Sequence, residues 1–363
     1  MPRRTATMLA STLVLFALLC AGVFLKVPYS EMSPGPTVNT LGDARGEPVL
    51  SISGRKTYPT SGHLNMTTVR VTSADYNMNL LEAVYGWLAG DNIVVPHENL
   101  YPDGKTDEQS TQENAEEFTQ SQQSAKVAAL KELGIPVTAR VIVSSVVKAS
   151  PSEGKLHAGD VIKAVDGTPV TEPGDVAKLV TRHKPGEPVE FTLVPAAEAA
   201  EAAKANREPA GSTKVTITTG KAEGDGHAIV GIRAGTDHSF PFSIDIKLSD
   251  VGGPSAGLMF ALGIVDKLTP EDLTGGKFIA GTGTIDDAGR VGPIGGIQMK
   301  TIGARQAGAR YFLTPAENCA VAAHDVPDGL TLVKVSTIGD ATAALKKIGK
   351  GDTAGLPQCG AKP

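Results

Sequence analysis

The chain has 363 residues, of which 41% are hydrophobic and 20% are charged, and its formal net charge at pH 7 is -5. This length accommodates two compact domains, and the composition is that of a globular protein rather than a disordered one. The acidic balance argues against a nucleic-acid partner, because binding to phosphates requires a basic surface.

The N-terminal segment predicts a membrane anchor. Residues 8–25 are uncharged and almost wholly apolar, and Arg3 and Arg4 precede them. A helix of this length spans about 27 Å, close to the thickness of a bilayer core. We therefore expect a transmembrane helix at 8–25, with residues 1–7 in the cytoplasm and the following domains outside the cell. A cleaved signal peptide is the alternative, with Cys20-Ala-Gly as a poor cleavage site.

The three cysteines fit this placement. Cys20 lies within the apolar segment, whereas Cys319 and Cys359 fall on the extracytoplasmic side, where an oxidising compartment permits pairing. A bridge between Cys319 and Cys359 would attach the C-terminal tail, residues 351–363, to the last domain. Two unpaired thiols are the alternative.

The segment after the anchor is rich in proline and then becomes mixed. Residues 26–46 contain three prolines within a short stretch, which favours an extended stalk over a helix or a central strand. Residues 47–133 follow as N-terminal strands and helices. Strands are expected at 47–53 and 65–72, a helix at 79–90, and a long polar helix facing solvent at 106–133.

Residues 134–195 carry a β-rich pattern with a specific motif. Between Gly154 and Gly167 the chain reads Gly-Lys-Leu-x-x-Gly-Asp-x-Ile-x-x-Val-Asp-Gly, with strands expected on both sides and a short helix at 174–183. This order resembles the PDZ domain in the permuted form of extracytoplasmic proteases.

The resemblance implies a peptide site beside a strand edge, because PDZ domains add an extended peptide to an exposed edge. We expect this edge at 141–146, facing the helix that carries Val176 and Leu179. The usual Gly-Leu-Gly-Phe carboxylate loop is missing from the pattern, which leaves recognition of a free C-terminus open. A β-domain without a ligand is the alternative.

An alanine-rich and glutamate-rich stretch follows the PDZ-like region. Residues 196–212 lack large apolar side chains and are expected to form a linker, in part helical. Strands at 214–218 and 240–248 then lead into the last domain, which we place at 213–350.

Two motifs of this last domain predict chemistry. Ser255 lies in Gly252-Gly-Pro-Ser-Ala-Gly, just before an apolar helix, and Lys300 follows the glycine-rich turn Pro293-Ile-Gly-Gly. A serine hydroxyl needs a base, and lysine can act as one only when burial lowers its pKa. Backbone N–H groups near Gly253 and Ser255 could hold an oxyanion at the helix start. Activity should therefore fall as the pH drops.

Both motifs, together with Gly281-Thr-Gly-Thr-Ile, resemble the Lon-type protease domain (peptidase family S16) over residues 226–345. The resemblance implies Ser255 as nucleophile, Lys300 as base and Thr282 as the residue that steadies the lysine. Residues 62–69 are similar to the opening strand of the Lon protease fold, which suggests that the PDZ-like unit is inserted into one protease domain.

With the anchor and the PDZ-like region, the chain resembles the membrane-anchored PDZ-Lon proteases of the YlbL type. The expected fold class is α+β: a Lon-type protease domain and a PDZ-like β-domain after one N-terminal transmembrane helix. The expected partners are extracytoplasmic peptides or unfolded proteins and the membrane. A homo-oligomer is suggested by the ring-forming Lon domains of the family.

No nucleotide, cofactor or metal is expected. The sequence lacks the phosphate loop Gly-x4-Gly-Lys-Ser/Thr, so the predicted protease is independent of ATP. The seven histidines are scattered and the cysteines lack the paired spacing of zinc ligands.

Two rival readings of the same residues remain. The Gly-x-Ser-x-Gly pattern around Ser255 also fits an esterase with His324 as base and Asp272 or Asp287 to orient it. A non-catalytic PDZ scaffold with an inert protease-like domain is the second rival.

Overall fold

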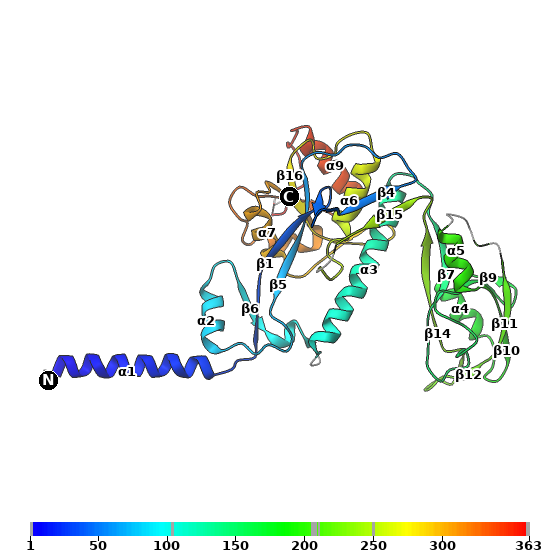
Figure 1. Cartoon of the computed structure of the whole chain (residues 1–363), viewed down its shortest axis with the longest axis horizontal. Coiled ribbons are helices and arrows are strands. Elements are labelled where there is room, and N and C mark those ends of the chain that lie inside the picture. The colour runs from blue at the N-terminus through cyan, green and yellow to red at the C-terminus, as the bar shows by residue number, and fades with distance from the viewer. Residues whose placement is uncertain (1–2, 103–104, 205–208, 210, 249–250, 361–363) are drawn as a thin grey trace. The chain divides into compact units, whose positions relative to one another are not determined.

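The computed structural model describes residues 3–102, 105–204, 209, 211–248 and 251–360. It divides into two compact units, of which unit 1 comprises Met1–Gly134 and Ile244–Pro363, and unit 2 comprises Ile135–Ser243. Unit 2 is thus an insertion between two halves of unit 1. Figure 1 shows both units, with many of their helices and strands labelled.

The N-terminal helix α1 (Arg3–Phe24) has 22 residues. Within the described part of the chain it is the single helix whose length and composition would allow it to cross a membrane. Most of its side chains are exposed, including Leu13, Phe16 and Leu18. An apolar helix whose side chains are mostly exposed needs an apolar environment, which agrees with the predicted anchor.

Unit 1 is built on a six-stranded sheet with the order β20-β19-β16-β5-β1-β6. Its strands are β1 (Tyr29–Asn39), β5 (His63–Val71), β6 (Ile93–Pro96), β16 (Phe278–Gly281), β19 (Tyr311–Pro315) and β20 (Thr331–Val335). The parallel pair β5 and β16 runs from His63 opposite Phe278 to Met66 opposite Gly281. This pair joins the N-terminal part of the chain to the C-terminal part in one domain.

Helices pack around this sheet, and α6 forms the centre of the core. The helices are α2 (Leu80–Leu88), α3 (Asp107–Glu132), α6 (Gly257–Leu268), α7 (Ile297–Gln306), α8 (Cys319–Ala322) and α9 (Ile338–Gly349). Short strands complete the unit: β2 (Asp43–Ala44), β3 (Glu47–Pro48), β4 (Leu50–Ser53), β15 (Ser243–Ile246), β17 (Thr284–Ile285) and β18 (Val291–Gly292). Nearly every side chain of α6 is buried, as its continuous apolar run requires.

The expected stalk at 26–46 is wrong, because most of it is strand β1. Strand β1 can contain prolines because they lie where their missing N–H groups are not needed for pairing. It pairs with β6 only from Tyr29 to Met32, whereas Pro34 and Pro36 lie farther along, at a register shift opposite β5. Missing N–H donors are harmless where a strand is an edge or bulges.

The solvent-facing helix predicted at 106–133 is also different in the structure. The second half of α3 is buried and packs against α6, with the rings of Phe118 and Phe260 in an edge-to-face contact at 5.8 Å between centroids. Small side chains such as Ala125 and Ala129 allow this close approach. The sequence shows apolar residues at helical spacing near the end of this segment, Val127 and Leu130, but its many Gln and Glu residues favoured a helix facing solvent.

Unit 2 is a separate β-domain with the sheet order β11-β10-β8-β7-β14. Its elements are β7 (Thr138–Val146), β8 (Val161–Val165), β9 (Thr168–Pro169), α4 (Pro173–Val180), β10 (Pro188–Val194), α5 (Ala196–Lys204), β11 (Thr213–Thr218), β12 (Gly220–Lys221), β13 (Ala228–Ile229) and β14 (Ile232–Ser239). Its core includes Val143, Leu179, Phe191 and Ile217.

Two boundaries differ from those expected. Strands β11 and β14 pair with β10 and β7, so residues 213–243 belong to unit 2 and not to the serine-bearing domain. The linker expected at 196–212 begins as helix α5, whose Ala199 and Ala202 are buried; residues 205–208 and 210 lie outside the described part. Alanine is small enough to pack against Val161 and Val194 without a large side chain.

The C-terminal tail is tied to unit 1. Cys319 and Cys359 form a disulfide, with their Cα atoms 4.9 Å apart. The backbone N–H of Cys359 also donates to the carbonyl of Leu332 on β20, and Lys334 donates to Pro357. The tail therefore packs beside the outer strand of the sheet up to residue 360.

Candidate active site

Three elements bring Ser255, Thr282 and Lys300 together. Ser255 lies in the bend before α6, Thr282 directly follows β16, and Lys300 is the fourth residue of α7. Glycines allow both bends, since Gly253 has φ of +80° and Gly296, the N-cap of α7, has φ of +67°. Asp250, two residues before the motif that begins at Gly252, lies outside the described residues.

The Lys300 amine is the centre of the site. Its Nζ lies 2.7 Å from Ser255 Oγ, 3.1 Å from Thr282 Oγ1 and 3.2 Å from the carbonyl oxygen of Thr67 on β5. Thr282 Oγ1 in turn donates to the backbone carbonyl of Ser255 at 3.0 Å. The threonine hydroxyl therefore has its proton committed, and its lone pair faces the lysine.

This arrangement suits a neutral amine. An uncharged amine has two N–H donors and one lone pair, and two of its three neighbours, Thr282 Oγ1 and the Thr67 carbonyl, act as acceptors. The remaining lone pair then faces Ser255 Oγ, which can donate its proton to it. The neutral Lys300 amine can therefore form all three hydrogen bonds, two as donor and one as acceptor.

Burial lowers the pKa of Lys300 from its usual value to about 7. Its side chain is 3% exposed, and desolvation penalises the ammonium form. A large fraction of the amine is therefore neutral at physiological pH, which is the state a base requires.

The backbone at the serine bend differs in part from the expectation. The N–H of Gly253 donates to the carbonyl of Asn114 on α3 at 2.8 Å, so it is not available to an oxyanion. Among the residues that the structure describes, no hydrogen bond from the Ser255 N–H is found, and this group lies at the start of α6. Of the two N–H groups, that of Ser255 is therefore the one available to a ligand at this bend.

A cleft of about 520 Å³ opens beside the serine. Its walls include Met32, Met66, Val69 and Val71 from β1 and β5, and Ser255 and Lys300 also line it. Within the described part, β16 pairs with β5 only as far as Met66, so the last residues of β5 continue past that strand along the cleft. An extended peptide could lie against this apolar wall.

The residues of the rival esterase are not joined to Ser255. In the described part of the chain, His324 makes no hydrogen bond to Ser255, whose Oγ contacts Lys300 instead. Asp272 is bonded to Ser61 and Thr274. No group of three or more His, Cys, Asp or Glu side chains that could hold a metal occurs among the described residues.

Two contacts of the site were missed from the sequence. The Thr67 carbonyl and Asn114 both act through backbone atoms, which any residue type supplies, so side-chain patterns carry no signal for them. The similarity of residues 62–69 to the opening strand of the Lon fold was the one indication that β5 belongs at the site.

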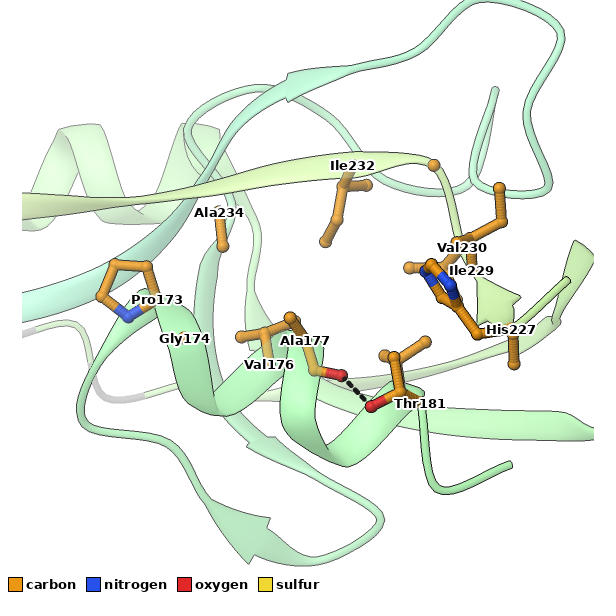
Figure 2. Close-up of a pocket in the computed structure, with 13 residues that line it drawn as sticks. Pro173, Gly174, Val176, Ala177, Thr181, His227, Ile229, Val230, Ile232 and Ala234 are labelled. Atoms are coloured by element: carbon orange, nitrogen blue, oxygen red, sulfur yellow. Dashed lines mark hydrogen bonds between the residues drawn. The ribbon is translucent and has the colours of Figure 1, made fainter. Parts of the chain in front are cut away.

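Unit 2 holds a second cavity, of about 450 Å³, between α4 and the edge strand β14. Figure 2 shows Ile232 and Ala234 of β14 across the cavity from Val176 and Ala177 of α4. The edge nominated at 141–146 is wrong, because β7 is paired on both sides, with β8 and β14. The groove is therefore bordered by β14, and strand β13 with residues 230–231 closes one end of it.

Comparisons with known proteins match both parts. Residues 115–198 match the PDZ domain, and residues 249–346 match the Lon protease (S16) C-terminal proteolytic domain. The Lon protease of Rhizobium meliloti is 39% identical over 95 residues, which are 25% of this chain and 11% of that protein. Lon protease 1 of Bacillus subtilis is 35% identical over 92 residues, 24% of this chain and 12% of that protein.

The matched stretch is thus a small part of these relatives' length. Among solved structures, the PDZ domain of an SdrC-like protein from Listeria monocytogenes is 21% identical, covers 26% of this chain and 86% of its own, and has a TM-score of 0.21. The two family matches confirm the expected α+β fold class. One chain therefore carries a region that matches the PDZ domain and a second region that matches the Lon protease (S16) proteolytic domain.

Proposed function

We propose that the chain is a serine endopeptidase in which Ser255 is the nucleophile and Lys300 is the general base. The hydrogen bond of 2.7 Å between Lys300 Nζ and Ser255 Oγ, in a buried site that lowers the lysine pKa, carries the proposal. The match to the Lon proteolytic domain supports it.

The reaction follows from the contacts. Neutral Lys300 accepts the Ser255 proton as Oγ attacks the carbonyl carbon of the scissile peptide bond. The Ser255 N–H at the start of α6 stabilises the resulting oxyanion. The lysine then returns the proton to the leaving amine, and the same amine activates the water that hydrolyses the acyl-enzyme. Thr282 keeps Nζ directed at Ser255 Oγ by accepting one of its N–H groups.

The proposed peptidase works without ATP and outside the cell. The sequence holds no phosphate loop of the kind that ATP-driven motors use. The disulfide between Cys319 and Cys359 supports an oxidising compartment, and α1 supplies the anchor. Short or unfolded polypeptides are the proposed substrates, since no unfolding motor is implied.

We propose that the PDZ domain presents these substrates at β14. The free edge of β14 offers backbone hydrogen bonds to an extended peptide, and the cavity beside α4 accepts an apolar side chain. Ala177 is exposed on the helix wall of this cavity, so Ala177→Arg should block it. Cleavage of short peptides should persist in this variant while cleavage of unfolded proteins slows.

Cleavage of a fluorogenic unfolded protein by the purified full chain, without ATP, tests the peptidase. Ser255→Ala and Lys300→Ala should abolish cleavage, and His324→Ala should retain it. Full activity in Lys300→Ala, or its loss in His324→Ala, would contradict the proposed base. Blocking free thiols in cells before extraction tests the compartment, because Cys319 and Cys359 should then be protected by their disulfide.

A further inference from the structure

Helix α2 exposes an apolar patch that unit 1 does not cover. Leu80, Val84, Trp87 and Leu88 follow the spacing i, i+4, i+7, i+8, which places them on one face of the helix, and Tyr85 lies beside them. The exposed fractions of Tyr85, Trp87 and Leu88 are 74%, 75% and 72%. We call these five residues the α2 patch.

The opposite face of α2 is fixed against the sheet. Ala83 and Gly86 are buried, and a Cβ added to Gly86 would lie 2.8 Å from Glu31 Oε2 and 2.9 Å from Val94 Cγ2. Position 86 therefore requires glycine, because any larger residue would collide with β1 and β6. The helix cannot rotate to bury its patch in unit 1.

The one charged residue of α2 is already engaged. Glu82 accepts hydrogen bonds from the backbone of Asn79, in a capping box, and from the hydroxyl of Tyr76. Its carboxylate therefore belongs to the helix start. The patch itself consists of three aliphatic and two aromatic side chains, with no charge among them.

The start of α2 is bonded to the end of α1. The N–H of Leu80 donates to the carbonyl of Leu25 at 2.9 Å, and Lys26 Nζ donates to the carbonyl of Asn77 at 2.9 Å. A Cβ on Gly22, in the last turn of α1, would lie 3.1 Å from the side chain of Leu81. The first turn of α2 is therefore level with the point where α1 ends.

We propose that the α2 patch lies in the interfacial layer of the bilayer that α1 spans, so that unit 1 is held at the membrane by two contacts. This inference rests on the proposed anchor. Lysine at the end of a spanning helix marks the headgroup level, and tryptophan and tyrosine concentrate there. A short amphipathic helix that begins at this level can bury its apolar face about 5 to 10 Å deep.

The second contact would fix the cleft close to the membrane. Met32, which lines the cleft beside Ser255, follows Lys26 by six residues, or at most about 20 Å of extended chain. Held in this way, the cleft would receive polypeptide segments that lie near the membrane surface.

The sole tryptophan of the chain makes the proposal directly measurable. The full chain is reconstituted in phosphatidylcholine vesicles, with or without bromine atoms on the upper acyl chain. Trp87 emission should be blue-shifted in both and strongly quenched in the brominated vesicles. The matched control is Trp87→Phe combined with Val321→Trp, which moves the probe to a side chain on α8 that is 49% exposed. Its emission should not be quenched.

Flotation of the vesicles in a density gradient distinguishes the role of the α2 patch from the role of the α1 anchor. Protein that floats with the vesicles while Trp87 stays unquenched would overturn the role of the patch and leave the anchor standing. Protein that fails to float would overturn the anchor and the patch together. A blue shift that grows with protein concentration and ignores bromination would show a second copy on the patch instead, which also contradicts the proposal. Leu88→Glu should reduce the quenching of Trp87 while flotation persists.

Discussion

Replacing Lys300 by methionine should stabilise the fold while abolishing cleavage. Burial lowers the lysine pKa from 10.5 to about 7, so between these values the folded chain binds fewer protons than the unfolded chain. Wild-type stability should therefore rise with pH through this window, because unfolding requires the lysine to take up a proton there. Below pH 7 the cost of burying the lysine is fully present, at up to about 5 kcal/mol.

Methionine has a similar shape and no proton, so Lys300→Met removes this pH dependence. The stability advantage of the variant should shrink by about 2 kcal/mol between pH 7 and pH 9. Urea unfolding of the detergent-solubilised full chain, followed by circular dichroism at both pH values, measures it. Ser255→Ala is the matched control, since it is also inactive but keeps the lysine and its slope. An advantage equal at both pH values would refute the reasoning.

The remaining predictions concern positioning and stability. Thr282→Val should lower kcat by about tenfold to a hundredfold with little change in KM, because Lys300 loses an acceptor, and Thr282→Ser should restore it; steady-state kinetics test this. Burial raises the pKa of Asp266 to about 6, so wild-type stability should fall as the pH rises through that value. The advantage of Asp266→Asn in urea unfolding should therefore grow by about 2 kcal/mol from pH 4 to pH 7, and a constant difference would contradict it. Replacing both Cys319 and Cys359 by serine should lower the unfolding free energy by about 4 kcal/mol, from closure of a loop with sequence separation 40.

The local chemistry of the site was predictable because its motifs dictate the bends. Glycine and proline around Ser255 and before α7 permit backbone conformations that other residues rarely adopt, so the sequence indicates both turns. The distance between the two motifs was not predictable in the same way. It depends on how β16 and α7 pack, and the family resemblance supplied that relation.

Elements whose role depends on distant partners were harder to predict. Residues 141–146 have the pattern of a strand, but only the pairing of β14 with β7 shows which strand is the edge. Similarly, α3 is polar along most of its length, and its burial against α6 depends on a few small side chains. Pro34 and Pro36 of β1 are compatible with a strand because the pairing of β1 with β6 stops at Met32, before both prolines. Each outcome depends on long-range pairing, which local periodicity does not encode.

The rate at which a fluorophosphonate modifies Ser255 tests the central claim most directly. Mass spectrometry of the full chain should find one adduct, on Ser255, which forms faster as the pH rises, with a midpoint near the Lys300 pKa of about 7. The adduct should be nearly absent in Lys300→Ala at every pH. Two results would contradict the role of the lysine as base. One is modification of Ser255 at an undiminished rate in Lys300→Ala, and the other is a modification rate that does not change between about pH 5 and pH 9.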